Sequence, residues 1–510
     1  MLFRQSNLRI IRTQFPRFSK SKKSKNNKAY STLSQHKPNN KTKGKILNPP
    51  LLASGLPITP TSWMNDRLPE FIWAALLILR LGRQDALTVF RRFFKYVELN
   101  LTKAPFSGSF SDIDSLNNSD KKRLIDFLCS DEFVKKALEP IVVMRELPSW
   151  DVWQQYLAVE PLSEHWDEIA FAVATVLNHK SQEATDCRWL KVMSLIASGH
   201  IKFLPETREV LYMFWEYPLI YDQREVCSKI RSYEMTVQNP MWKTTMASDW
   251  PRRFWGECLA KTPCKPWNHI DIPIITDATT TISHVNMVYN EVIGHCNSCR
   301  TTTAMDARHD TSFGLVLYSL SLLKELLSIG VSVKISGRML LRTLMELFIK
   351  FEYLVKKDQS DIWKADRSYG AGQAKLVFLK LQEYIDQPGY VDQATLEELA
   401  NEDVWQEFQP INIGSWSGMD LRKMSEETGL KDVYDKFYPW TSGFVHSNWG
   451  AIRDTTFQLC ANPLHRLHRI PRDSARSLPD VISDACGLVD RILEVLDRAY
   501  PNFKTRITII

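Results

Sequence analysis

The chain has 510 residues, too many for one hydrophobic core, so we expect at least two domains. Its hydrophobic content of 44% and charged content of 24% are typical of a folded globular protein and exclude a wholly disordered chain. The net charge of +7 comes from residues 1–46, which hold 13 Lys or Arg and no acidic residue, so the rest of the chain is mildly acidic.

Residues 1–50 form a basic tail that we expect to be disordered. Its Lys and Arg side chains repel one another, and the tail contains no acidic residue to offset this repulsion. Cationic tails bind nucleic acid by displacing counterions, and the candidate contacts here are Lys22, Lys23 and Lys25. The first twenty residues also resemble an organellar transit peptide, since they are Arg-rich and free of acidic residues. A tail that only aids solubility is the third interpretation.

Three segments follow the tail. Residues 51–238 show helical patterns separated by Pro and Gly, without the hairpin pattern of Val, Ile and Thr, which predicts an N-terminal helical domain. Residues 239–269 are rich in Trp and Pro and are predicted to connect two domains. Residues 270–510 show the long amphipathic patterns of a helical bundle domain. The predicted fold class is therefore all-α, with two helical domains.

Some helical patterns are stronger than the rest. The run from Leu68 to Leu81 is apolar nearly all round, which predicts a helix at the centre of the first domain. Further helices are predicted at Gln182–Ser198, at Val333–Lys357, at Val433–Leu459 with a kink at Pro439, and at Pro479–Ala499.

One predicted helix carries a line of polar residues. Arg338, Arg342, Glu346 and Lys350 recur every four residues between apolar flanks, so they lie on one face of the helix. Arg342 and Glu346 can form an intrahelical ion pair, worth roughly 0.2–0.5 kcal/mol. Leucines surround this pair, so we expect it to be half-buried and to need a specific partner. If His446 meets it, the three residues form a candidate catalytic site: Arg342 for phosphate, His446 for proton transfer and Glu346 for orientation.

These residues also carry a resemblance. The Arg342-x3-Glu346 helix, followed by Ser442-x3-His446, resembles a bacterial family whose helical domain is of unknown function. The segment SWMNDRLPEFIWAALL, from Ser62 to Leu77, is similar to the longer members of that family. The resemblance implies no established activity, and it implies an association with bacterial anti-phage or abortive-infection systems.

The second domain distantly resembles the helical nucleotide-binding bundles of the HEPN type. Their ribonuclease members place an Arg shortly before a His, the Arg holding the scissile phosphate. This sequence departs from that pattern, because no Arg lies shortly before His446 and Arg453 follows it instead. A ribonuclease would therefore need Arg342, from another helix, in place of the missing partner.

The nine Cys lie mostly in apolar contexts, which indicates reduced residues and a cytoplasmic protein. The longest apolar runs are shorter than the roughly 20 residues that cross a bilayer, so we expect no membrane partner. The pair Cys296-x-x-Cys299 would need a second pair for a structural zinc site, and Cys258 and Cys264 lie about thirty residues upstream. We predict a reduced pair in a turn, and we assign no metal ligand and no cofactor.

A second basic cluster lies before the last helix. Arg466, Arg469 and Arg472 are candidate nucleic-acid contacts, and His465 and His468 would strengthen them below about pH 6.5. A solvated loop is the alternative interpretation.

We therefore expect a nucleic-acid-interacting component or effector of a bacterial anti-phage system, with RNA as the first candidate partner. One alternative is a metal-independent, HEPN-like ribonuclease centred on Arg342, Glu346 and His446. The other is a non-enzymatic scaffold in which these residues only fix the register of the helices. Each of these three functions is compatible with a homodimer.

Overall fold

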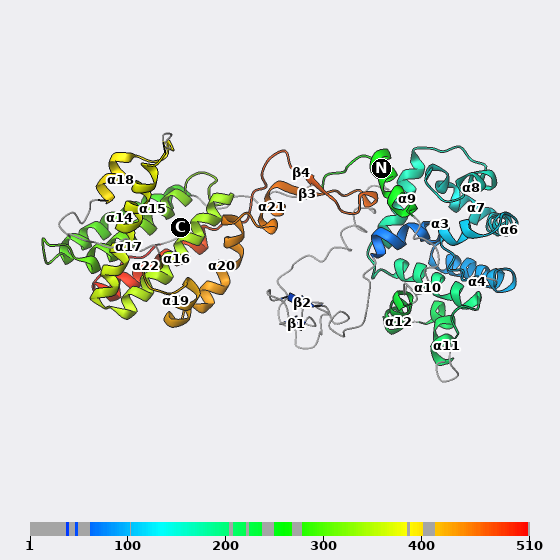
Figure 1. Cartoon of the computed structure of the whole chain (residues 1–510), viewed down its shortest axis with the longest axis horizontal. Helices are drawn as coiled ribbons and strands as arrows, with labels where there is room; N and C mark the ends of the chain where they lie inside the picture. The colour runs from blue at the N-terminus through cyan, green and yellow to red at the C-terminus, as the bar shows by residue number, and fades with distance from the viewer. Residues whose placement is uncertain are drawn as a thin grey trace. The chain divides into compact units, whose positions relative to one another are not determined.

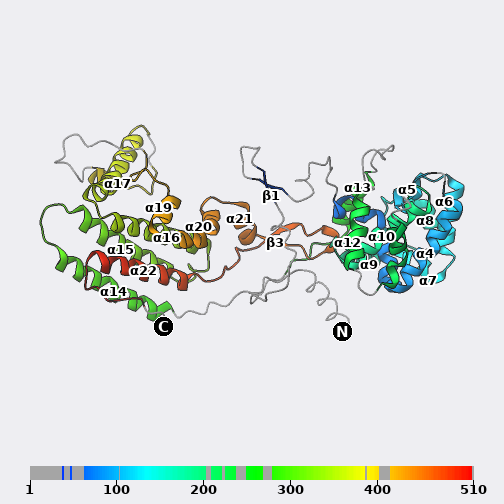
Figure 2. The same cartoon turned by 90° about the horizontal axis from the view of Figure 1, so that it is seen from below.

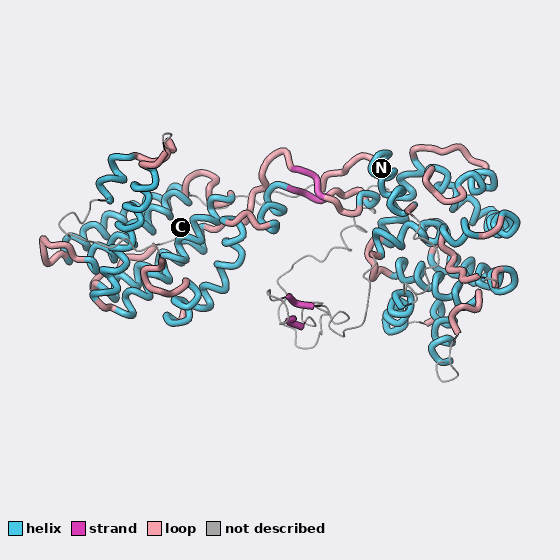
Figure 3. Tube along the Cα trace, in the orientation of Figure 1, coloured by secondary structure: helices cyan, strands magenta, loops and turns pink. Residues whose placement is uncertain are grey.

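The structure is a computed structural model and describes residues 37–39, 46–48, 62–102, 104–202, 208–220, 224–236, 249–267, 278–384, 388–400 and 414–507. Two compact units divide the chain: unit 1 comprises residues 1–267 and 459–470, and unit 2 comprises residues 268–458 and 471–510. Helices build both units (Figure 1). The strands in the described part of the chain form two short two-stranded pairs, drawn in magenta in Figure 3. The fold class is all-α, and that prediction is confirmed.

Unit 1 surrounds the apolar helix α3 (Ile72–Leu81). Its residues 72–77 are completely buried, because several neighbouring helices pack against this part of the helix. The predicted central helix is therefore confirmed. The other helices and helical turns of unit 1 are η2 (Trp63–Arg67), η3 (Leu68–Phe71), α4 (Arg83–Asn100), α5 (Phe110–Ser115), α6 (Asn118–Cys129), α7 (Glu132–Leu138), η4 (Glu139–Val143), α8 (Trp150–Leu157), α9 (Glu164–Val176), α10 (Gln182–Ala197), α11 (Arg208–Glu216), η6 (Tyr217–Leu219), α12 (Arg224–Thr236), α13 (Trp250–Lys261) and η8 (Pro463–His465).

Polar caps fix where several helices begin. Asn117 accepts a hydrogen bond from the backbone N–H of Asp120 at the start of α6, and Ser181 accepts one from Ala184 at the start of α10. Each such cap stabilises its helix by about 1 kcal/mol. Within the segment expected as a connection, α13 buries Trp250 in the core of unit 1, so this stretch contributes to the domain before it.

Unit 2 is a bundle with α16 (Ile335–Lys357) at its centre. Figure 2 shows α14 (Ala278–Cys299), α15 (Ala307–Leu326) and α22 (Ile482–Ala499) running beside it, and α16 packs against α15 and α22. The other helices of unit 2 are α17 (Ser360–Leu381), α18 (Gln393–Ala400), α19 (Leu421–Thr428), α20 (Lys431–Val445) and α21 (Trp449–Thr456).

The predicted helix Val433–Leu459 is divided in two. Helix α20 contains Pro439 but ends at Val445, and α21 begins at Trp449. The chain turns between them at Ser447, whose φ of 51° is left-handed and incompatible with a continuous helix.

A short segment near the C-terminus belongs to unit 1 although the residues on both sides of it belong to unit 2. Strand β3 (Phe457–Leu459) pairs with β4 (Arg469–Pro471), and residues 459–470 belong to unit 1. Boundaries drawn along the sequence could not show this excursion. In the N-terminal tail, β1 (Lys37–Asn39) pairs antiparallel with β2 (Ile46–Asn48). None of the described helices combines the length and the apolar character that crossing a membrane requires.

Candidate ligand-binding pocket

The polar residues along one face of α16 have two different surroundings: Arg338 is buried, whereas Arg342 and Glu346 line a pocket. Arg338 is buried near the start of the helix, where its guanidinium donates to the carbonyls of Ser332, at 2.8 Å, and Pro479. Burial lowers the pKa of Arg338 to about 10. This arginine holds two loops to the helix, so its role is structural. One turn further on, Arg342 and Glu346 line a pocket.

Arg342 has one strong partner and one group without a partner. Its Nε donates to Glu346 Oε1 at 2.8 Å, and its guanidinium carbon lies 4.4 Å from the ring centroid of Tyr438 on α20. The side chain is only 12% exposed, and its buried Nη1 has no hydrogen-bond partner. A buried donor in that state costs roughly 1–3 kcal/mol, which an incoming acceptor could recover.

The surrounding pocket, which we call the Arg342 pocket, has a volume of about 520 Å³. Lys350, Tyr318, Trp416 and Tyr438 line it with Arg342 and Glu346. The Nζ of Lys350 lies 2.7 Å from Asp366 and 5.7 Å from the ring of Trp416. Two cations therefore stand beside aromatic rings, and each of them is also paired with a carboxylate. Among the described residues that line the pocket there is no histidine or cysteine, and Glu346, Lys350 and the two tyrosines are its titratable groups besides Arg342.

His446 lies apart from the predicted pair. It follows the last residue of α20, its side chain is exposed, and its backbone N–H donates to Ser442 O at 3.0 Å. Tyr438, which contacts Arg342, precedes it by eight residues, or about 12 Å of helix. The structure thus brings Arg342 and Glu346 together and does not bring His446 to them.

The predicted nucleic-acid contacts have varied surroundings. Lys22, Lys23 and Lys25 lie outside the described residues. Within unit 1, Arg466 donates to Asn65 Oδ1 at 2.6 Å and stacks over the ring of Trp255. In unit 2, the Nε of Arg472 donates to Phe457 O at 3.1 Å. Arg469 is half-buried in β4. Arg466 and Arg472 therefore help to hold their own loop in place.

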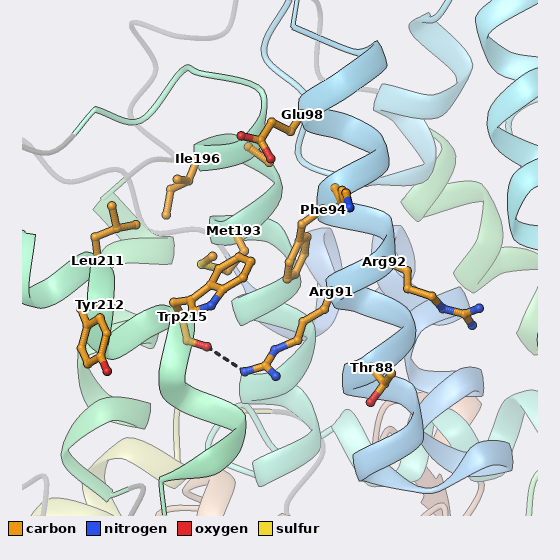
Figure 4. A pocket seen from close by; sticks show the side chains of 12 residues that line it. Thr88, Arg91, Arg92, Phe94, Glu98, Met193, Ile196, Leu211, Tyr212 and Trp215 are labelled. Carbon is orange, nitrogen blue, oxygen red and sulfur yellow. Dashed lines mark hydrogen bonds between the residues drawn. The ribbon is translucent and has the colours of Figure 1, made fainter.

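A second pocket, in unit 1, was not found from the sequence. It lies between α4, α10 and α11, has a volume of about 870 Å³ and is drawn in Figure 4. There, Arg91 donates to the carbonyl of Trp215 at 3.1 Å, and the Phe94 ring lies close by. Arg92 points away and pairs with Asp131. The cations on α4 are visible in the sequence, but Trp215 lies 124 residues from Arg91, so the pocket itself is not.

Comparison with known proteins adds one finding. Residues 314–458 match a family of unknown function, DUF5677. No curated protein and no solved structure matches the chain. The matched stretch is an uncharacterised helical domain, and every residue that lines the Arg342 pocket lies within it. The residues of the unit 1 pocket all lie outside it.

Proposed function

We propose that the domain of residues 314–458 binds nucleic acid, RNA in the first place, through the Arg342 pocket. The observation that carries the proposal is the buried Nη1 of Arg342, which has no partner although its Nε is held by Glu346. A phosphate oxygen is an acceptor that would satisfy it with a charge-assisted hydrogen bond.

The aromatic residues supply the second half of the recognition. Trp416 is half-buried at the pocket, and its ring meets that of Tyr353 edge to face at 6.0 Å. Such a ring offers a surface on which a base can stack, worth roughly 1–3 kcal/mol per base. A volume of about 520 Å³ falls within the range of pockets that hold small ligands, so one nucleotide unit can enter.

Replacing Arg342 by glutamine is expected to weaken the binding of single-stranded RNA roughly 10- to 100-fold, because a hydrogen bond to a charged group worth about 1.5–3 kcal/mol is lost. The measurement is fluorescence anisotropy of a labelled single-stranded RNA titrated with the full chain at fixed salt.

A control variant is offered by the same unit. Arg422→Gln breaks a pair with Glu426 at the same helical spacing, but on the open surface, where the Arg422 side chain is 61% exposed. Its affinity should stay within roughly 5-fold of the parent, since Arg422 does not line the Arg342 pocket and an exposed charge contributes at most about 1 kcal/mol. Equal losses in the two variants would show a general effect of charge, and no loss in Arg342→Gln would exclude the pocket.

The basic tail is proposed as a second, sequence-independent contact. Deleting residues 1–46 is expected to make RNA binding less sensitive to salt, because up to 13 cations no longer displace counterions. The measurement is the slope of log affinity against log salt concentration. A chain with the same tail residues in scrambled order should keep the parent slope, and a truncated chain with an unchanged slope would exclude this role.

The ribonuclease alternative requires His446 to reach the Arg342 pocket. RNA that is cleaved by the parent chain and left intact by a His446→Ala variant would support that alternative. RNA that stays intact with both proteins leaves binding as the function. The proposed setting, a cytoplasmic bacterial anti-phage system, rests on the family resemblance described above. A variant that no longer binds RNA but still protects cells against phage would favour the scaffold alternative.

A further inference from the structure

Four side chains that commonly bind transition metals gather in unit 1, and none of them lines either pocket. They are Cys264, Cys460, His465 and His468, and their sulfur and nitrogen atoms all lie within 4.8 Å of one another. Cys264 follows α13, while the other three belong to the loop between β3 and β4. About 200 residues separate the two segments, so the group exists only in the folded chain.

The distances between these atoms match the edges of a coordination tetrahedron. Cys264 Sγ lies 3.5 Å from His465 Nδ1 and 3.3 Å from His468 Nε2, and Cys460 Sγ lies 3.4 Å from His465 Nδ1. A tetrahedral Zn²⁺ bound at about 2.3 Å from sulfur and 2.0–2.1 Å from nitrogen places these two kinds of ligand roughly 3.5 Å apart. Three of the six distances among the four atoms therefore agree with such a tetrahedron, and the other three are at most 4.8 Å.

The hydrogen bonds of Thr262 fix the proton on His465. The Thr262 hydroxyl donates its proton to Cys258 O at 2.7 Å, so toward His465 Nε2, at 3.0 Å, its oxygen is an acceptor, as it is toward Asn462 Nδ2. The Nε2 of His465 therefore carries the ring proton, and the lone pair of Nδ1 faces the two sulfurs. A hydrogen-bonded outer nitrogen is the usual device that orients a histidine ligand toward its metal.

The backbone holds both ligand segments in register. Trp267 N–H donates to Leu459 O at 3.1 Å, and Asn462 Nδ2 donates to Pro263 O at 3.0 Å. The N–H of Lys265 points to Cys460 Sγ at 3.4 Å, a contact that would stabilise a thiolate. These contacts arrange the sulfur and nitrogen atoms before any ion binds.

Burial differs among the four residues in a way that suits a metal site. Cys460 and His465 are buried, His468 is half-buried and Cys264 is exposed, so an ion can enter from one side.

We propose that Cys264, Cys460, His465 and His468 bind one Zn²⁺ ion, which clamps the returning loop of residues 459–470 onto residues 262–267 of unit 1. Two thiolates and two imidazoles in a tetrahedral arrangement are the typical ligands of structural zinc. Four protein ligands leave no open position for a substrate, so the role is structural and independent of RNA binding.

The test begins with the metal content of the purified full chain, measured by inductively coupled plasma mass spectrometry after dialysis. One zinc per chain is expected in the parent, and most of it should be lost in Cys264→Ser and in His468→Ala. Cys264 is exposed, so its serine variant should keep the far-ultraviolet circular dichroism spectrum of the parent. Co²⁺ added to the metal-free parent should give the intense visible absorption of a tetrahedral thiolate site, and Cys264→Ser should not.

The second pair of cysteines provides a matched control. Cys296 and Cys299 lie on α14, and their neighbours His309 and His295 direct Nε2 to the backbone carbonyls of Cys296 and Tyr500, both at 3.0 Å. A Cys296→Ser, Cys299→Ser double variant should therefore retain its zinc. The proposal is overturned if the parent stays free of metal after incubation with equimolar Zn²⁺, if Cys264→Ser retains the parent content, or if intact-mass analysis shows a disulfide between Cys264 and Cys460.

Discussion

Replacing Glu234 by glutamine is expected to lower the free energy of unfolding of unit 1 by about 3–5 kcal/mol. Glu234 on α12 is completely buried, and its carboxylate contacts Arg67, Lys191 at 2.8 Å and Arg188 at 3.7 Å. All three cations are buried or nearly so. Removing the negative charge leaves them to repel one another in a medium that screens them poorly.

The effect can be measured by urea denaturation followed by tryptophan fluorescence, since eleven of the sixteen tryptophans belong to unit 1. Glu225→Gln is the control, because Glu225 lies on the same helix and pairs with Lys229, yet its side chain is 77% exposed. The free energy of unfolding of that variant should be at most about 0.5 kcal/mol below that of the parent. A small loss in both variants would mean that the buried cations do not depend on Glu234.

The same carboxylate predicts a dependence of stability on pH. Burial raises the pKa of Glu234, but Lys191, Arg67 and Arg188 outweigh it, and the pKa falls from 4.5 to about 2. A folded-state pKa below the unfolded value stabilises the fold above pH 4.5, and this contribution is lost as the pH falls toward 2. The free energy of unfolding of the parent should therefore exceed that of Glu234→Gln by about 3 kcal/mol at pH 7 and by roughly 1.5 kcal/mol at pH 3. A difference between the two proteins that stays constant over this range would contradict the assignment.

The sequence predicts well those features that neighbouring residues determine. Helix α16 was predicted at Val333–Lys357 and is found at Ile335–Lys357, because its apolar periodicity is complete within the segment itself. The pairing of Arg342 with Glu346 follows from the same periodicity, since residues four apart meet on one face of a helix.

Features that depend on packing between distant segments could not be predicted in the same way. Glu234 lies 167 residues from Arg67, and Cys264 lies 204 residues from His468, so no local pattern connects them. The placement of His446 shows a related limit. The register between α20 and α16 puts Tyr438 against Arg342, and this register is set by side-chain packing in the bundle.

Replacing Gly337 by alanine is expected to lower the free energy of unfolding of unit 2 by about 1–3 kcal/mol, although alanine is normally the better helix residue by about 1 kcal/mol. A Cβ at this position of α16 would stand 2.7 Å from Val331 O and 2.8 Å from Ser332 O. Neither oxygen can yield freely, because one accepts from Lys334 N–H at 3.0 Å and the other from Arg338 Nη1 at 2.8 Å. The preceding loop must therefore move away, and the contacts of Arg338 weaken with it.

Gly487→Ala separates this clash from helix propensity. Gly487 is an exposed residue within α22 of the same unit, and a Cβ added there meets nothing within 4 Å. It should therefore stabilise unit 2 by up to about 1 kcal/mol, so the two alanine variants shift the denaturation midpoint in opposite directions. Hydrogen exchange at the start of α16 should become faster in Gly337→Ala alone, because only that variant displaces the loop. If both variants stabilise unit 2, the loop at Val331 and Ser332 does not approach α16 as closely as described.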